Sequence, residues 1–327
     1  MLILDENTIK NIYHMNDAIK DLKDNLFLKN TNQIENPQRT VLTFPKYEAS
    51  ALYMPSANRT QEVVSIKIVS IFPNNPSQER PTTQGVLLLT DASTGEHICL
   101  MNASYLTRLR TGALSGIATS KFSRLNSSVL GVIGTGAMAF EQVLGVLQVR
   151  EIKKIMLYNK TRKKAEEFEE RLIDFGVMLD ISIEHNVDEL VETADIICCS
   201  TRSNDPVFNG KLLKPGTHIN GIGSYLPSMR EVDLETVHRS SKIIVDDLEG
   251  VKEEEGELIF ANQVSDWSFS DVFAELSDTL INDELQRDSS EEITFFKSVG
   301  AAYFDLIVAL GVYRKAKEEG VGIEVIL

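Results

Sequence analysis

The sequence predicts an α/β protein that combines a parallel sheet with a separate β-rich region, and three observations support this fold class. Short β-rich segments separated by Pro, Asn and Gly fill positions 39–100. From position 129 onward, buried strands alternate with helices, which is typical of parallel sheets with crossover helices. A long helix rich in Ala, Leu and Val is expected to close the chain over about 296–319.

Length and charge limit the size and the partners of the protein. The chain has 327 residues, which corresponds to two domains at roughly 150 residues each. Its 33 Lys and Arg against 48 Asp and Glu give a formal net charge of −15. This negative charge argues against nucleic acid and anionic membranes as main partners, because both attract positive surfaces. An anionic ligand would therefore need a few local cations.

Neither the cysteines nor the histidines form a disulfide or metal pattern. Cys99, Cys198 and Cys199 are odd in number and two are adjacent, so we expect free core thiols rather than redox groups. The five histidines show no paired ligand spacing, so we expect no metal site. No apolar run approaches the ~20 residues of a membrane span, and acids follow the first residues where a signal peptide carries basic groups. We expect a cytoplasmic protein.

The first hundred residues are expected to form a leading helix and an antiparallel sheet. Residues 2–4 suggest a short strand, and Asp5 or Asn7 can cap a helix that runs to about Lys29. Residues 91–95 have the composition of a hairpin turn. The β-rich segments begin at Val41, Ala51, Val63 and Gly85.

A helix over about 102–122 leads into the alternating region. The strands expected there cover residues 129–133, 154–159, 195–200, 218–221 and 242–245. The helices expected between them cover residues 137–149, 161–175 and 188–192. The acidic stretch Glu253–Glu257 is expected to be a solvated turn.

A glycine-rich turn follows the strand expected at 129–133. Residues 134–139 form a G-x-G-x-x-A motif, in which Gly134 permits a tight turn and Gly136 lets the backbone approach a pyrophosphate. The following helix offers free N–H groups and the positive end of its dipole to phosphates. The strand before the motif, the helix after it and the next strand at the right distance together predict a dinucleotide site. The expected contacts are Gly134, Thr135, Gly136, Ala137 and Met138.

The residues after the next strand favour NADP(H) over NAD(H). A carboxylate at this strand end would bind the ribose 2′-hydroxyl of NAD, but the chain has Asn159 followed by Lys160 and Arg162. This basic cluster suits a 2′-phosphate. The alternative is a solvated basic helix start, although the helix dipole favours acids in the first turn. We expect NADP(H) to be preferred with NAD(H) as the second option, and all three side chains to contact the cofactor.

Six segments in a fixed order carry a further indication of family: Tyr53–Pro55, Ser65–Asn75, Gly85–Glu96, Leu106–Ser115, Gly131–Ala137 and Phe296–Asp305. Their order and spacing resemble the ornithine cyclodeaminase/mu-crystallin family over nearly the whole chain, and its ketimine and pyrroline-2-carboxylate reductase branch in particular. The resemblance implies a Rossmann-type NAD(P)-binding domain and a β-rich domain for substrate binding and dimerisation, built from both chain ends. We accordingly assign 1–122 and 296–327 to the substrate domain and 123–295 to the Rossmann domain, and expect a homodimer.

The chemistry of this family is hydride transfer between a nicotinamide and the α-carbon of an amino or imino acid. The resemblance maps Arg39, Lys67 and Arg110 onto the cluster that binds the substrate carboxylate, with Lys67 and Arg110 as the catalytic candidates. An unpaired ammonium in mid-strand would be costly to bury, and a guanidinium can bind a carboxylate through two hydrogen bonds. Strand alternation leaves open that Lys67 lies on a solvent face. If burial lowers its pKa, Lys67 is also a candidate proton donor or acceptor at the substrate nitrogen.

Five more positions complete the candidate site. Thr111 either binds a phosphate or packs. Thr201 follows an expected strand, at a carboxyl end that faces the cofactor crevice. Val299 and Gly300 resemble the nicotinamide-lining segment of the family. Asp305 could orient a cation or could be a surface acid.

One departure from the family concerns the loop after the strand at 218–221. Cyclodeaminases that resemble this chain carry an Asp in that loop, and we align it with Tyr225. Neither Ser224 nor Tyr225 is a comparable base near neutral pH, and Asp233 lies further along the chain. The missing acid favours simple reduction or oxidation over ornithine cyclisation.

We therefore expect an NAD(P)H-dependent reductase of a small cyclic imino acid, forming proline from pyrroline-2-carboxylate or pipecolate from piperideine-2-carboxylate. The alternatives are an ornithine cyclodeaminase that forms proline and ammonia, an amino-acid dehydrogenase of the alanine dehydrogenase type, and a non-catalytic NADPH-binding protein like mu-crystallin. Retention of Arg39, Lys67 and Arg110 argues against the last. The expected partner is a small imino or amino acid.

Overall fold

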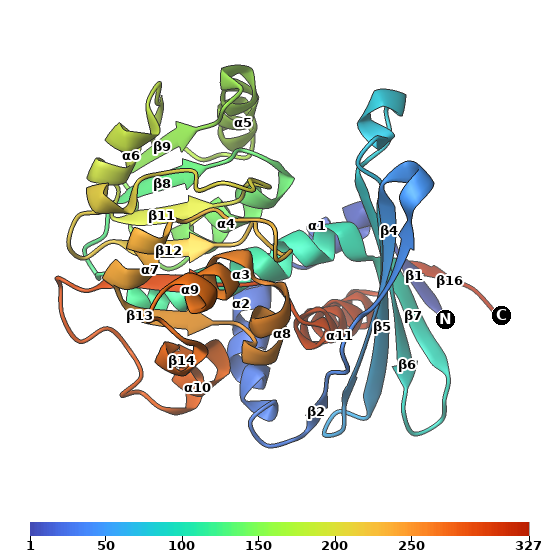
Figure 1. Ribbon diagram of the computed structural model, residues 1–327. Helices are drawn as coiled ribbons and strands as arrows, with labels where there is room; N and C mark the ends of the chain where they lie inside the picture. Colours follow the sequence, from blue (N-terminus) through green and yellow to red (C-terminus); the bar gives the residue numbers. More distant parts are fainter. Residues whose placement is uncertain (327) are drawn as a thin grey trace. The chain divides into compact units, whose positions relative to one another are not determined.

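The computed structural model describes residues 1–326, which divide into two compact units (Figure 1). The first unit joins Met1–Arg110 to Ala301–Leu327, and the second is Thr111–Gly300. Both ends of the chain therefore belong to one unit. The sequence predicts boundaries at 122/123 and 295/296, whereas the units change partway along helix α3 (Ala103–Phe122) and just after strand β15 (Ile293–Lys297).

The first unit contains an eight-stranded sheet in the order β16-β1-β7-β6-β5-β4-β2, with β3 also paired to β4. Strands β4 to β7 form an antiparallel meander, and β1 runs parallel to β7. The expected hairpin turn is confirmed, because the Gly95 N–H donates to the Asp91 carbonyl. The strands are β1 (Leu2–Leu4), β2 (Ile34–Glu35), β3 (Thr40–Phe44), β4 (Ala49–Asn58), β5 (Val63–Ile71), β6 (Thr83–Asp91), β7 (His97–Asn102) and β16 (Ile323–Glu324).

The leading helix is two helices, α1 (Glu6–Ile12) and α2 (Met15–Asn25), so the prediction of one helix to Lys29 is wrong. Asp5 caps α1, since its carboxylate accepts the Thr8 N–H at 2.8 Å. The second helix starts separately because His14 is extended and donates its backbone N–H to the Asp17 carboxylate. This reciprocal cap satisfies groups that a continuous helix would have paired internally.

The closing helix α11 (Ala302–Glu319) packs on α2, β4 and β5 within the first unit (Figure 1). Its predicted start near Phe296 is wrong, because Ile293–Lys297 is strand β15 of the second unit. A run buried on both faces gives no periodicity that separates strand from helix. The turn at Gly300, with φ +84°, separates the strand from the helix.

The second unit is built on eight parallel strands in the order β10-β9-β8-β11-β12-β15-β13-β14 (Figure 1). Besides β15, the strands are β8 (Val129–Ile133), β9 (Lys154–Tyr158), β10 (Asp180–Ile183), β11 (Ile196–Cys199), β12 (His218–Gly221), β13 (Ser240–Val245) and β14 (Ala274–Glu275). The helices are α4 (Ala137–Leu147), α5 (Arg162–Asp174), α6 (Val187–Thr193), α7 (Leu234–Arg239), α8 (Leu248–Glu254), α9 (Gly256–Val264) and α10 (Leu276–Ile281). The sequence patterns did not reveal β10 or β14.

Two hydrophobic clusters cover the two faces of this parallel sheet. Strand β11 shows the division, because Ile196 and Cys198 belong to the cluster with α4 and α5, while Ile197 and Cys199 belong to the cluster with α6, α7 and α9. The prediction of free core thiols is confirmed. Burial raises the pKa of Cys198 to about 12, which keeps this thiol protonated and unreactive.

The acidic stretch Glu253–Glu257 is not a solvated turn, and that prediction is wrong. Glu255 is fully buried and caps α9, where its carboxylate accepts the N–H groups of Glu257 and Leu258. Glu257 is buried as well, and both carboxylates pair with the buried ammonium of Lys297. Composition alone missed this pairing because the lysine is distant in sequence. Within residues 1–326, no helix is long and apolar enough to cross a membrane.

Candidate active site

The order of the parallel strands places two predicted loops at one point of the sheet edge. From β8 the chain continues to β9 on one side, whereas β11 lies on the other side of β8. Gly134 follows β8 and Thr201 follows β11, so both lie where the strand order reverses. Sheets of this kind bind ligands in the crevice at that point.

The glycine turn has the geometry that the motif predicts. Gly134 has φ +87°, and a Cβ there would lie 2.7 Å from the Thr201 Cγ2. Gly136 is the N-cap of α4, and a Cβ at that position would meet no atom within 4 Å. The uncapped first turn of α4 therefore faces open space, which suits a pyrophosphate. Ala137 is exposed and Met138 is half-buried beside it.

The end of β9 has two kinds of contact. The Asn159 Nδ2 donates to the Thr135 Oγ1 at 2.9 Å, which ties the second strand end to the glycine turn. Lys160 and Arg162 are exposed, and the Arg162 Nε donates to Glu166 at 3.1 Å. The first turn of α5 carries no acid, and its basic residues face solvent, where Arg162 pairs with Glu166 and Lys163 with Glu167 one turn on.

The segment after β15 is held by a carboxylate that the sequence patterns did not reveal. Asp246, fully buried at the end of β13, accepts the Gly300 N–H at 2.8 Å and the Ser298 hydroxyl at 2.6 Å. The Val299 N–H points to the same carboxylate at 3.4 Å. An acid directly after the buried run 243–245 was the available indication, since it falls at a carboxyl strand end.

The predicted cations meet a buried carboxylate inside the first unit. The Lys67 Nζ lies 2.5 Å from the Asp305 Oδ2, and the Arg110 Nε lies 3.3 Å from the Asp305 Oδ1. Lys67 is 2% exposed and Asp305 is 0% exposed. The solvent-face alternative for Lys67 and the surface alternative for Asp305 are therefore wrong. The Thr107 hydroxyl completes the group at 3.4 Å from the Asp305 Oδ1.

The charges in this cluster shift one another's ionisation. Burial lowers the pKa of Lys67 to about 8; the Asp305 carboxylate opposes this shift, while Arg110 and Arg39 add to it. Although burial raises the pKa of Asp305, Arg110 and Lys67 outweigh it and hold that pKa below its ordinary value. Arg39 is half-buried and close enough for its charge to act on Lys67. Two cations thus pair with one buried carboxylate, and a third acts on Lys67, in a protein of net charge −15.

Thr111 is buried in α3, directly after Arg110. It belongs to the second unit, whereas Arg110 belongs to the first. Its suggested contact with a phosphate stays a prediction.

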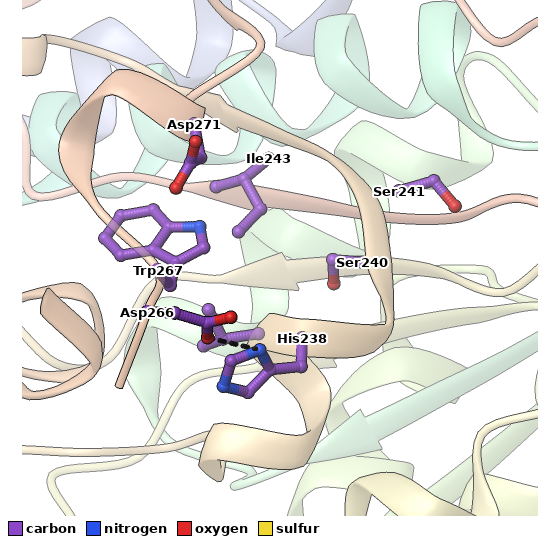
Figure 2. A pocket seen from close by; sticks show the side chains of 8 residues that line it. His238, Ser240, Ser241, Ile243, Asp266, Trp267 and Asp271 are labelled. Carbon is purple, nitrogen blue, oxygen red and sulfur yellow. Dashed lines mark ion pairs between the residues drawn. The ribbon is translucent and has the colours of Figure 1, made fainter. Parts of the chain in front are cut away.

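A surface pocket of about 270 Å³ lies at the amino end of strand β13 (Figure 2). Ser240 and Ser241, at the amino end of β13, contribute to its lining together with Trp267. The exposed pair His238 and Asp266 approach each other to 3.8 Å there. Since cofactors bind at the carboxyl ends of such strands, this pocket is not the dinucleotide site.

The comparisons agree with this architecture over the whole chain. The model of the ornithine cyclodeaminase/mu-crystallin family matches residues 1–320. A Delta(1)-pyrroline-2-carboxylate reductase from Bacillus cereus is 38% identical over 98% of each chain. The solved Delta(1)-pyrroline-2-carboxylate reductase of Thermococcus litoralis, in complex with NADH and L-proline, has a TM-score of 0.95 and 34% identity, covering 99% of this chain and 100% of that one.

A solved archaeal alanine dehydrogenase dimer with bound NAD is also similar, with a TM-score of 0.91 and 31% identity over 100% of this chain and 99% of that one. The second unit thus has the Rossmann-type fold that the glycine motif predicts. The chain belongs to the ornithine cyclodeaminase/mu-crystallin family.

Proposed function

We propose that this protein is an NAD(P)H-dependent reductase that converts a small cyclic imino acid, pyrroline-2-carboxylate or piperideine-2-carboxylate, to proline or pipecolate. The observation that carries the proposal is the buried cluster of Lys67 and Arg110 on Asp305, with Arg39 beside it. The similarity to two pyrroline-2-carboxylate reductases supports the substrate, and one of these holds L-proline.

The cluster fits a substrate with a carboxylate. Lys67 and Arg110 carry two buried positive charges, and Asp305 neutralises one of them. The charge of Arg39 acts on Lys67 as well. Burying a surplus of positive charge is costly unless a ligand anion joins it. A guanidinium can bind that carboxylate through two hydrogen bonds, which also fixes the orientation of the imine ring.

Lys67 supplies the proton that reduction requires at the substrate nitrogen. With a pKa of about 8, its ammonium is present at neutral pH and still acidic enough to transfer a proton. Bound NAD(P)H supplies the hydride for the imine carbon. Asp305 holds the ammonium in place and is not itself a donor, because its pKa is low.

For the cofactor, we propose NADP(H) as the preferred form, with NAD(H) also used. The exposed cations Lys160 and Arg162 at the end of β9 favour a 2′-phosphate, and Asn159 brings no charge to repel it. The Thermococcus relative holds NADH.

The loop after β12 favours reduction over ornithine cyclisation. Tyr225 is half-buried there, and Ser224 is fully buried. The carboxylates that Ser224 contacts belong to Glu255 and Glu257, which are buried themselves and paired with Lys297. Neither loop residue offers the base that ring closure with loss of ammonia would use.

We also propose a homodimer formed through the first sheet. The face of β5 opposite Lys67 carries Val64, Ile66 and Ile68, and Val86 pairs with Ile68 across from β6. Val64 is 38% exposed and Val86 is 44% exposed. An apolar sheet face of this kind is typical of an interface, and a two-fold axis would bury it against its own copy.

The carboxylate requirement tests the proposed reaction. Pyrroline-2-carboxylate should be reduced, whereas 1-pyrroline, which lacks the carboxylate, should react at least about 100-fold more slowly in kcat/KM. R110A should lower kcat/KM for the carboxylate substrate by about 10- to 100-fold, because a charge-assisted contact is lost. R108A is the matched control, since Arg108 lies on the same helix but pairs with Glu6. Equal rates with both substrates would contradict the proposal.

A further inference from the structure

We propose that Glu231 is a positioning residue for the cofactor: it orients the Thr201 hydroxyl and holds the loops after β11 and β12 together. The inference rests on the proposed nicotinamide site. The Glu231 Oε1 accepts the Thr201 N–H at 2.5 Å and the Thr201 hydroxyl at 2.8 Å. Its Oε2 accepts the Gly223 N–H at 2.6 Å. One carboxylate thus joins two strand ends at the edge where the cofactor is expected.

The two loops approach so closely that only glycine fits between them. A Cβ on Gly223 would lie 2.0 Å from the Thr201 carbonyl oxygen and 2.5 Å from the Glu231 Oε1. Such distances exclude any side chain without a shift of the backbone. Gly223 therefore lets Glu231 reach both loops at once.

Glu231 fixes the role of the Thr201 hydroxyl. Because the hydroxyl proton is donated to Glu231, the oxygen faces outward only as an acceptor. One lone pair accepts the Ser203 N–H at 3.4 Å, and one remains. Thr201 is half-buried, so a ligand can reach it. The partner it selects is a hydrogen-bond donor of the cofactor, either the carboxamide NH₂ or a ribose hydroxyl.

The surroundings of Glu231 hold it rigidly. It is fully buried, and its own N–H donates to Glu257 at 2.7 Å. Burial raises the pKa of Glu231; the Lys297 ammonium opposes the rise, Glu257 adds to it, and the hydrogen bonds from Thr201 oppose it. In E231Q, an NH₂ donor would replace one of the two acceptor oxygens. It would then face an N–H or O–H group that the carboxylate of Glu231 now accepts.

The experiment measures cofactor binding by NADH and NADPH fluorescence with the full-length protein, independently of substrate. T201V should raise the Kd about 3- to 10-fold, the effect of one lost hydrogen bond, and T201S should restore it. E231Q should raise the Kd by a similar factor. The double variant E231Q/T201V should have a Kd no higher than that of the single variant that binds the cofactor less tightly, because both substitutions act on one contact. In steady-state assays, the KM for the cofactor should rise, whereas kcat should stay within about twofold of the wild-type value.

D195N is the matched control, because Asp195 is a buried carboxylate just before β11 that accepts the Ser128 and Val129 N–H groups and contacts neither Thr201 nor Glu231. Its Kd should stay within about twofold of wild type. An unchanged Kd for E231Q, an equal loss in D195N, or multiplicative losses in the double variant would overturn the inference. If E231Q does not fold, E231D carries the same prediction, because the shorter carboxylate cannot reach both loops. A wild type that binds neither cofactor would instead refute the proposed function and the inference with it.

Discussion

Lys67 lies in the middle of β5, 2% exposed, with its ammonium on the Asp305 carboxylate. The charges around a buried lysine of this kind decide whether it is protonated. Asp305 stabilises the ammonium, whereas burial, Arg110 and Arg39 destabilise it, and the resulting pKa is about 8. The group therefore changes its charge within the range in which enzymes are assayed.

The pH dependence of reduction should report this lysine. Because the pKa of Lys67 is lowered to about 8, its ammonium is present below that pH and is lost as the pH rises through it. We expect kcat/KM for pyrroline-2-carboxylate to fall about tenfold per pH unit above about 8, and proline oxidation to rise over the same range. Steady-state rates from about pH 6 to about pH 10 give both profiles.

D305N separates Lys67 from other titrating groups. Since Asp305 raises the pKa of Lys67, its removal should move the falling limb of the reduction profile to lower pH. A limb that stays in place in D305N would assign it to the substrate or to another residue.

At the scale of elements, the strand–helix alternation and the glycine turn were predictable from local patterns. The failures have physical causes. The break at His14 depends on one reciprocal cap, and the helix start expected near Phe296 falls within β15 because buried runs show no period. Asp246 and Glu231 were not found, because their partners come from strands that are neighbours only in the folded sheet. Family resemblance supplied the roles of the three cations, and the spacing of residues could not.

Helix α5 provides a test of cofactor choice. R162A should weaken NADPH binding by ~1–3 kcal/mol and leave NADH nearly unchanged, because a 2′-phosphate contact is charge-assisted. K163A is the matched control, since Lys163 pairs with Glu167 one turn on, as Arg162 pairs with Glu166. Fluorescence titrations of both variants with both cofactors give the dissociation constants. Equal losses for both cofactors in R162A would refute the assignment.

At the scale of the whole molecule, the residues of the proposed substrate and cofactor sites fall in two different units. The carboxylate cluster lies in the unit formed by both chain ends, and the glycine turn lies in the other. The negative net charge is consistent with this division, because the cations that would bind anions are few and local.

The proposed dimer can be tested through its sheet face. V86D should shift the protein from dimer to monomer in sedimentation velocity, because a carboxylate in an apolar interface would lose its hydration. V264D serves as the control, since Val264 is 53% exposed on α9 of the other unit. A wild type that sediments as a monomer at micromolar concentration would contradict the homodimer.

The reaction class is tested most directly by stoichiometry. With the wild-type protein and pyrroline-2-carboxylate, one NADPH should be oxidised for each proline formed. With ornithine, ammonia release should be about 100- to 10,000-fold slower than in a cyclodeaminase that carries the loop carboxylate, because a general base usually contributes a factor of that size. Robust formation of proline and ammonia from ornithine without net cofactor turnover would contradict the account, and would assign the missing base to a residue outside the loop that carries Tyr225.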